Sequence, residues 1–79
     1  MQEICKEIEE LTFKIAGDHY LVPEITVKKE SDGIHIYLDT DVVSLEFLVN
    51  LDKELRKLGY YISDIFPADW GFDLLLQEI

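Results

Sequence analysis

The residues of this 79-residue chain that most readily suggest chemistry are two histidines, one cysteine and an Asp-Thr-Asp triplet. A catalytic or metal-binding histidine needs partners that converge on it. His19 and His35 fall in different predicted elements, and no spaced set of further ligands accompanies either one. We expect His35 to be an ordinary surface histidine, paired with its neighbours across two strands.

The triplet Asp39-Thr40-Asp41 has the D-x-D spacing of some metal sites. Carboxylate sites for divalent cations usually need three or more oxygen ligands. A strand end that runs into a helix cap explains the same residues with fewer assumptions, because Thr and Asp are good N-caps. The sequence therefore predicts no metal site and no cofactor.

Cys5 lies next to Lys6 near the start of a predicted helix, where a thiolate could be stabilised. No base is fixed beside it by the sequence, so a half-buried structural cysteine is the simpler interpretation. A single cysteine also allows no disulfide within the chain. The sequence shows no nucleophile paired with a general base and no phosphate-binding loop, so we expect a protein that is not an enzyme.

The clearest structural signal is a β-hairpin over residues 24–40, with strands at 24–30 and 34–40. Asp32-Gly33 between two alternating runs favours a two-residue turn. In that register Val27 faces Leu38. One face of the hairpin is then apolar and the other polar, the apolar face consisting of Ile25, Val27, Ile36 and Leu38.

Two amphipathic helices flank this hairpin. The first is predicted over residues 2–16 and ends at Gly17, which suits a C′ position. The second is predicted over residues 41–58, capped by Thr40 or Asp41. Their apolar stripes are Ile4, Ile8, Leu11 and Ile15 in the first, and Leu48, Leu51, Leu55 and Leu58 in the second.

Two further strands are predicted over residues 60–66 and 72–79, joined by residues 67–71. Asp64 interrupts the apolar side of this pair, which indicates an edge or a bulge. Trp70 stands in the connection. Tryptophan is enriched in binding hot spots, so Trp70 is either a protruding anchor or a lid on the end of the core.

The order α-β-β-α-β-β makes one small α+β domain over residues 1–79. Moving the last strand to the front gives β-α-β-β-α-β, so the fold resembles a circularly permuted ferredoxin-like sandwich. We predict a two-layer α/β sandwich with a four-stranded antiparallel or mixed sheet and both helices on one face. The expected spatial order is 60–66, 72–79, 34–40, 24–30, with the two central strands parallel. A sequential meander is the alternative.

The formal net charge is −10, from 17 acidic and 7 basic residues. Such a field disfavours direct binding to nucleic acid or to an anionic membrane and favours basic partners, although solubility alone could account for much of it. No apolar run approaches the roughly 18 residues of a membrane span. We expect a cytoplasmic protein.

The uncovered sheet face should combine apolar and aromatic residues with an acidic rim, which is typical of a protein interface. RNA-binding sheets carry aromatics in basic surroundings instead. We therefore expect a non-enzymatic protein-binding module. One version is a nucleic-acid-mimicking inhibitor of a basic protein, like the anti-CRISPR-like anti-defence proteins of phages and mobile elements. The alternative is a self-associating assembly domain, a homodimer through the same face. The candidate partner-binding residues are Tyr37, Asp39, Tyr61, Ile65, Asp73, Leu75 and Trp70, with Glu3, Glu7 and Glu10 on the first helix.

Overall fold

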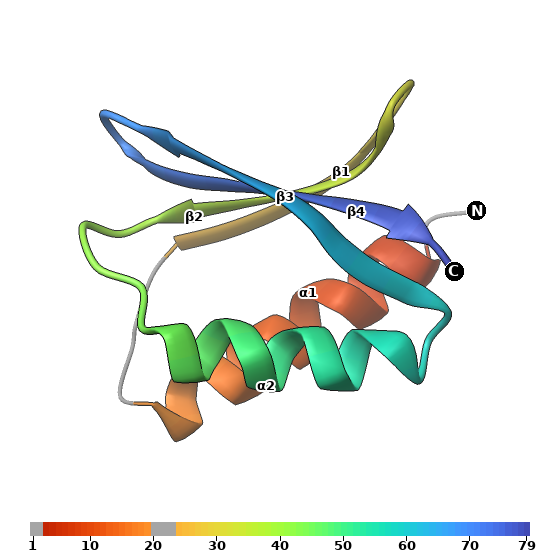
Figure 1. The fold of residues 1–79 in the computed structure, drawn as a ribbon, viewed down its shortest axis with the longest axis horizontal. Coiled ribbons are helices and arrows are strands. Elements are labelled where there is room, and N and C mark those ends of the chain that lie inside the picture. The colour runs from red at the N-terminus through yellow and green to blue at the C-terminus, as the bar shows by residue number, and fades with distance from the viewer. Residues whose placement is uncertain (1–2, 20–23) are drawn as a thin grey trace.

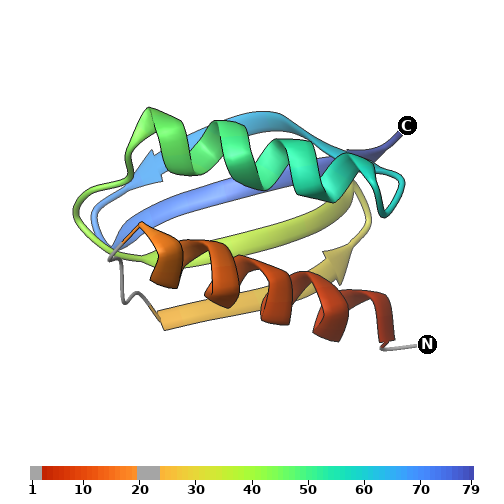
Figure 2. The ribbon, with the colours of Figure 1, turned by 90° about the horizontal axis from the view of Figure 1, so that it is seen from below.

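The computed structural model of the chain describes residues 3–19 and 24–79. The elements are α1 (Glu3–Asp18), β1 (Glu24–Glu30), β2 (Gly33–Asp39), α2 (Leu45–Arg56), β3 (Tyr60–Ala68) and β4 (Gly71–Glu78). The four strands form one layer and both helices form the other, so one face of the sheet is left uncovered (Figure 1). Seen from below, α1 and α2 lie side by side across the other face (Figure 2). Neither described helix is long and apolar enough to cross a bilayer.

The sheet order is β1-β2-β4-β3, which is the order of the permuted ferredoxin-like sandwich and excludes the meander. Every neighbouring pair is antiparallel. The prediction that the two central strands are parallel was wrong, for a topological reason. The crossover through α2 makes β2 and β3 run in the same direction, and the tight turn between β3 and β4 then sets β4 antiparallel to β2.

The β1–β2 hairpin has the predicted faces but a register displaced by two residues. Glu30 pairs with Gly33, so the turn consists of Ser31 and Asp32 and not of Asp32 and Gly33. Side chains alternate with a period of two, so a displacement of two leaves every residue on its predicted face. Gly33 begins β2 with a φ of 141°, and a Cβ there would collide with the backbone oxygen of Leu76. This glycine lets β4 approach the hairpin closely.

The core lies between the sheet and the helices and contains the apolar residues that the sequence patterns selected. Phe47, Leu51 and Leu55 of α2 are completely buried, as are Leu74 and Leu76 of β4. Their apolar partners come from α1 and from the hairpin, namely Ile8, Ile15, Ile25, Ile36 and Leu38.

The C-terminal end of α1 and the N-terminal end of α2 differ from prediction. α1 continues through Gly17 to Asp18. α2 begins at Leu45 and not at residue 41, because Ser44 is its N-cap and accepts a hydrogen bond of 3.0 Å from the Phe47 amide. Thr40 instead hydrogen-bonds within its own turn to Val42. Several capping residues stand before this helix, and the burial of Phe47 selects Ser44 among them.

The predicted irregularity near Asp64 is a β-bulge. The register shifts between Ile62, which pairs with Leu76, and Asp64, which pairs with Leu75. Asp52 of α2 accepts hydrogen bonds from the Ile62 amide at 2.9 Å and from Nε of Arg56 at 2.9 Å. Burial of Asp52 raises its pKa, but these two hydrogen bonds outweigh burial and hold the pKa below its usual range. The carboxylate therefore fastens the bulged edge of the sheet to α2.

Candidate functional site

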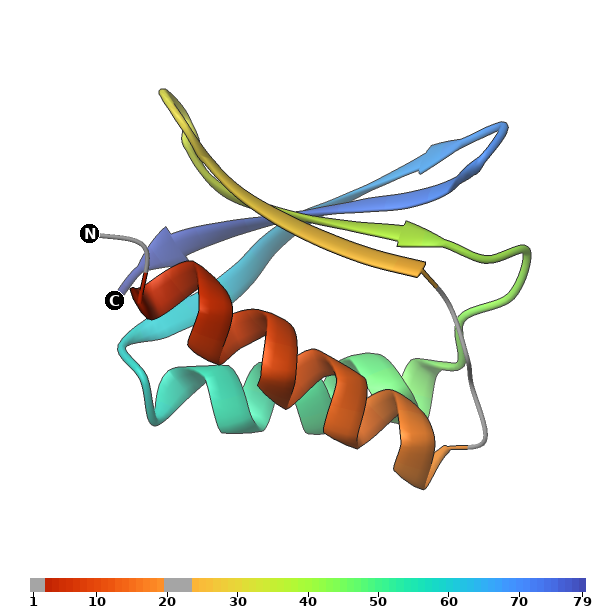
Figure 3. The ribbon, with the colours of Figure 1, turned by 180° about the vertical axis from the view of Figure 1, so that it is seen from behind.

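The uncovered face of the sheet, hereafter the open face, is bounded by the two hairpin turns. Both turns bend away from the helices at opposite ends of the molecule, so the open face lies between them (Figures 1 and 3). Directly paired residues of an antiparallel sheet point to the same side. The ladder therefore places on this face Glu24, Thr26, Lys28, Glu30, His35, Tyr37, Asp39, Asp73, Leu75, Gln77, Tyr61, Asp64 and Phe66.

His35 stands between two aspartates at the centre of this face. Its Nδ1 lies 2.8 Å from Asp73 and its Nε2 lies 2.7 Å from Asp32. Carboxylates that accept at both ring nitrogens require both nitrogens to donate, which makes the ring an imidazolium. The residue is only 7% exposed. The predicted pairing across strands is confirmed by the contact with Asp73 of β4, but the prediction of a surface position was wrong, since His35 is buried and paired at both ring nitrogens.

The two aspartates shift the titration of this ring. Burial is the largest single effect and lowers the pKa of His35, but the hydrogen bonds to Asp73 and Asp32 together raise it above its ordinary value. The same hydrogen bond from His35 is the main cause that lowers the pKa of Asp32. The pairing with Asp32 therefore stabilises the charged form of both partners.

We expect His35 to make stability depend on pH. Its folded-state pKa is raised, so its contribution is fully present below the unfolded value of about 6.5 and is lost as the pH rises through the folded value. Asp32 has the opposite sign, so its contribution is lost in acid, as the pH falls from about 4.

The measurement is urea unfolding of the wild type and of His35→Gln at pH 5.5 and pH 8.5. The free energy of unfolding of the wild type should exceed that of the variant by more at pH 5.5 than at pH 8.5. A difference that stays constant, or that grows with pH, would contradict the imidazolium assignment.

A row of stacked rings runs from His35 toward the β3–β4 turn. The rings of His35 and Tyr37 are stacked, with centroids 5.6 Å apart and planes 12° apart. The Trp70 ring follows at 5.8 Å from Tyr37, tilted by 54°. The Tyr37 hydroxyl donates to Glu30 at 2.7 Å, and this hydrogen bond is the main cause that raises the pKa of Tyr37 to about 12. Tyr37 is therefore a fixed, neutral aromatic surface.

A cation could be held where the turn meets this row. Glu30, Asp32 and His35 each offer one ligand atom, and these atoms all lie within 4.8 Å of one another. In the observed arrangement Nε2 of His35 already lies 2.7 Å from a carboxylate oxygen of Asp32. The positively charged ring of His35 thus already supplies to Asp32 the positive charge that a metal ion would supply.

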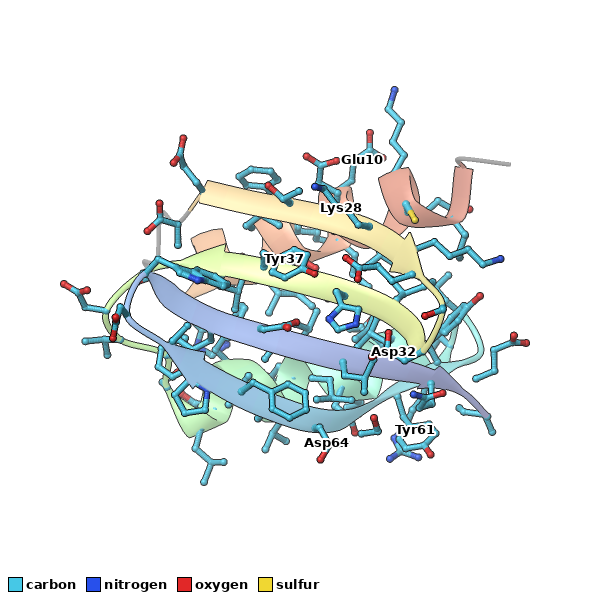
Figure 4. The ribbon with its side chains drawn as sticks, turned by 90° about the horizontal axis from the view of Figure 1, so that it is seen from above. Glu10, Lys28, Asp32, Tyr37, Tyr61 and Asp64 are labelled. Atoms are coloured by element: carbon cyan, nitrogen blue, oxygen red, sulfur yellow. The ribbon has the colours of Figure 1, made fainter. Side chains whose placement is uncertain are left out.

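The charge on the open face is strongly one-sided. Among the residues that the described strands place on this face, Lys28 is the only lysine. Figure 4 shows its side chain toward the β1 edge, away from Asp64 on the opposite edge. Against this lysine stand six carboxylates, five on strands and one in the first turn: Glu24, Glu30, Asp39, Asp64, Asp73 and Asp32. Only Asp32 and Asp73 have a cationic partner among the described residues, and that partner is His35.

Most of the residues selected from the sequence are on this face. The structure brings Tyr37, Asp39 and Trp70 together, and Asp73 pairs directly with Tyr37 in the ladder. Tyr61 lies at the β3 edge, under the Arg56 guanidinium at 5.6 Å.

Leu75 has its predicted position but is only 8% exposed, so it contributes little contact area. Ile65 was assigned to the wrong face. It pairs with the core residue Leu74, because the bulge reverses the alternation of β3 beyond Ile62. Phe66, which pairs with Asp73 and is 46% exposed, occupies the open face instead.

The predicted acids of α1 belong to the helix layer. Glu7 and Glu10 are exposed there, and Figure 4 shows Glu10 beyond the β1 edge and not over the strands. The side chain of Glu3 lies outside the described part of the structure. The helix acids and the open face therefore do not form one continuous surface.

A shallow groove of about 740 Å³ crosses the β1 edge at one end of the open face. Three residues that the sequence analysis had singled out, Tyr37, Asp39 and Trp70, line it, together with Phe13 and Glu24, which had not been proposed to bind. Phe13 is 47% exposed. The signal available in the sequence was its position off the apolar stripe of its helix. The remaining lining residues are Ile25, Thr26 and Lys28.

The chain matches no known protein family, and neither a curated protein nor a solved structure matches it. A function for this chain therefore rests on the geometry and charge of its own side chains.

Proposed function

We propose that this chain is a non-enzymatic protein-binding module that covers a basic surface of another protein with its open face. The observation that carries the proposal is the uncovered sheet face, with six carboxylates and one lysine around exposed aromatic rings. Trp70 and Phe66 are 45% and 46% exposed. Exposed aromatics supply contact area at low entropic cost, and a field of one sign steers a partner of the opposite sign.

A basic surface of that kind is typical of a site that binds nucleic acid. In the finer version of the proposal, the chain occupies such a site and excludes the nucleic acid, acting as an inhibitor by mimicry. The net charge of −10 supports this version, because a phosphate backbone presents the same sign to the partner. Duplex DNA or RNA added in excess should then displace the chain from its partner.

The test is affinity capture from an extract of the native host with three baits. The first is the wild-type chain. The second, hereafter the open-face variant, carries Asp39→Lys and Asp64→Lys on the open face and Asp69→Lys in the β3–β4 turn that bounds it. All three acids are exposed and make no ion pair among the described residues. The third carries Glu7→Lys, Glu10→Lys and Asp18→Lys, which change the net charge equally but lie on α1.

We expect a basic protein that the wild type and the α1 variant retain and that the open-face variant loses almost completely. Single exposed ion pairs contribute only about 0–1 kcal/mol each, so three reversals are needed for a clear loss. Equal retention by all three baits would refute the open face as the binding surface. If the chain runs above monomer size by itself and the open-face variant does not, self-association is the better account.

A further inference from the structure

Two carboxylates stand directly opposite each other at the open end of the β1–β2 hairpin. Glu24 pairs with Asp39 in the ladder, and both are exposed. Residues in this relation have their Cβ atoms about 4.5–5.5 Å apart, and like charges there destabilise a sheet. Neither carboxylate has an ion-pair partner among the described residues. Lys28 lines the same groove, but it is four residues further along β1, about 13 Å away by strand rise, and makes no ion pair with either carboxylate among the described residues.

This carboxylate pair lies in a groove that is also lined by aromatic rings. Glu24 and Asp39 line the groove of about 740 Å³ together with Phe13, Tyr37 and Trp70. The Tyr37 and Trp70 rings are 5.8 Å apart and tilted by 54°, so they present a corner and not a flat surface. Phe13 of α1 adds a third aromatic ring to the lining. A cation in this groove would meet π-faces and two unpaired carboxylates at once.

An arginine side chain has the chemistry that these groups recognise. Its planar guanidinium stacks on aromatic faces while its N–H groups donate to carboxylates in a fixed fork. A lysine ammonium is a compact, strongly hydrated charge and gains less from the aromatic rings. We propose that this groove is the docking site for an arginine side chain of the basic partner. The proposal rests on the proposed function, since a basic protein must first approach the open face.

A second copy of this chain is a poor source of that arginine. Arg56 is the only arginine in the sequence. It already donates to Asp52 at 2.9 Å and stacks over Tyr61 at 5.6 Å. Taking it into the groove of another copy would break both contacts and release the Asp52 carboxylate, which also holds the bulge of β3 through the Ile62 amide. The occupant we infer is therefore a different, arginine-bearing protein.

The test uses Trp70 as its own reporter, because it is the only tryptophan in the chain. Its fluorescence is followed while the full chain is titrated with three peptides that are identical except at three positions, which hold arginine, lysine or the neutral isostere citrulline. The arginine peptide should bind roughly fivefold or more tightly than the lysine peptide, the share expected from guanidinium stacking. The citrulline peptide should give no saturable change.

Two variants decide whether the groove is responsible. Glu24→Gln with Asp39→Asn removes both negative charges of the groove and leaves Lys28 unchanged, and Glu7→Gln with Asp18→Asn removes two negative charges on α1. The groove variant should bind the arginine peptide about tenfold more weakly, and the α1 variant should change binding less than twofold. Because the groove variant relieves a like-charge pair, its melting temperature should be equal to or above that of the wild type, and a loss of binding cannot then be attributed to unfolding.

The possible failures are distinct. If the arginine and lysine peptides bind equally, or if both variants lose the same binding affinity, the groove is not an arginine site. Binding by a diffuse acidic face would remain, and the proposed function requires no more than that. Absence of binding by every cationic peptide at low salt would overturn the groove and the electrostatic basis of the proposed function together.

Discussion

Leu38→Ala is expected to lower the free energy of unfolding by about 2–5 kcal/mol. Leu38 is completely buried in β2, between Ile25 of β1 and Phe72 of β4 in the ladder. Removing its side chain leaves a cavity where the two central strands meet the helices. For a domain of this size, whose stability is typically about 5–15 kcal/mol, that loss is a large fraction of the total. Urea denaturation at constant pH measures it directly.

Leu45→Ala is the matched control, because the chemical change is the same and Leu45 is 76% exposed at the start of α2. It should change stability by no more than about 0.5 kcal/mol. Tyr37→Ala, next to Leu38 but on the open face, should cost clearly less than Leu38→Ala. Equal costs at positions 37 and 38 would mean that the faces of β2 are assigned wrongly.

Gly71→Ala is expected to be the most damaging of the glycine substitutions at hairpin turns. Gly71 has a φ of 152°, a conformation that residues with a side chain rarely adopt. A Cβ there would also overlap the backbone oxygen of Leu38 and press on the amide of Thr40. Both obstacles are backbone atoms and cannot rotate away. The strained conformation alone costs on the order of 1–3 kcal/mol, and separation of the β3–β4 turn from the end of β2 adds to it.

The same change at Gly17 should have the opposite sign. Gly17 lies inside α1, and a Cβ there meets nothing within 4 Å. Alanine in a helix is favoured over glycine by about 0.5–1 kcal/mol. Urea midpoints should therefore fall for Gly71→Ala and rise for Gly17→Ala, with unchanged m-values. A neutral Gly71→Ala would show that the tip of the β3–β4 hairpin is not held against β2.

The type and order of all six elements could be predicted because each carries its own local period. The stripe on α1 and the alternation of Ile36 and Leu38 in β2 do not depend on the rest of the chain. Exact registers were less accessible. A displacement of two residues in the β1–β2 hairpin leaves every face unchanged, so the hydrophobic pattern does not distinguish the two registers.

The parts of the site that were missed depend on contacts between distant segments. Asp73 meets His35 only through the pairing of β2 with β4, 38 positions apart in sequence. Ile65 was misplaced because one bulge reverses the faces of the strand beyond it. The groove is lined by both Phe13 of α1 and Trp70 of the last hairpin, and neither residue indicates the other in the sequence.

We propose that the open face meets a basic protein through its charge. The most direct test is the association rate constant with the captured partner, measured at about 50 mM and 200 mM salt. Electrostatic steering predicts a fall of about tenfold or more between the two salts, with a dissociation rate that changes much less. The variant with Asp39→Lys, Asp64→Lys and Asp69→Lys should associate slowly at both salts. An association rate that is independent of salt and of these three reversals would contradict the account.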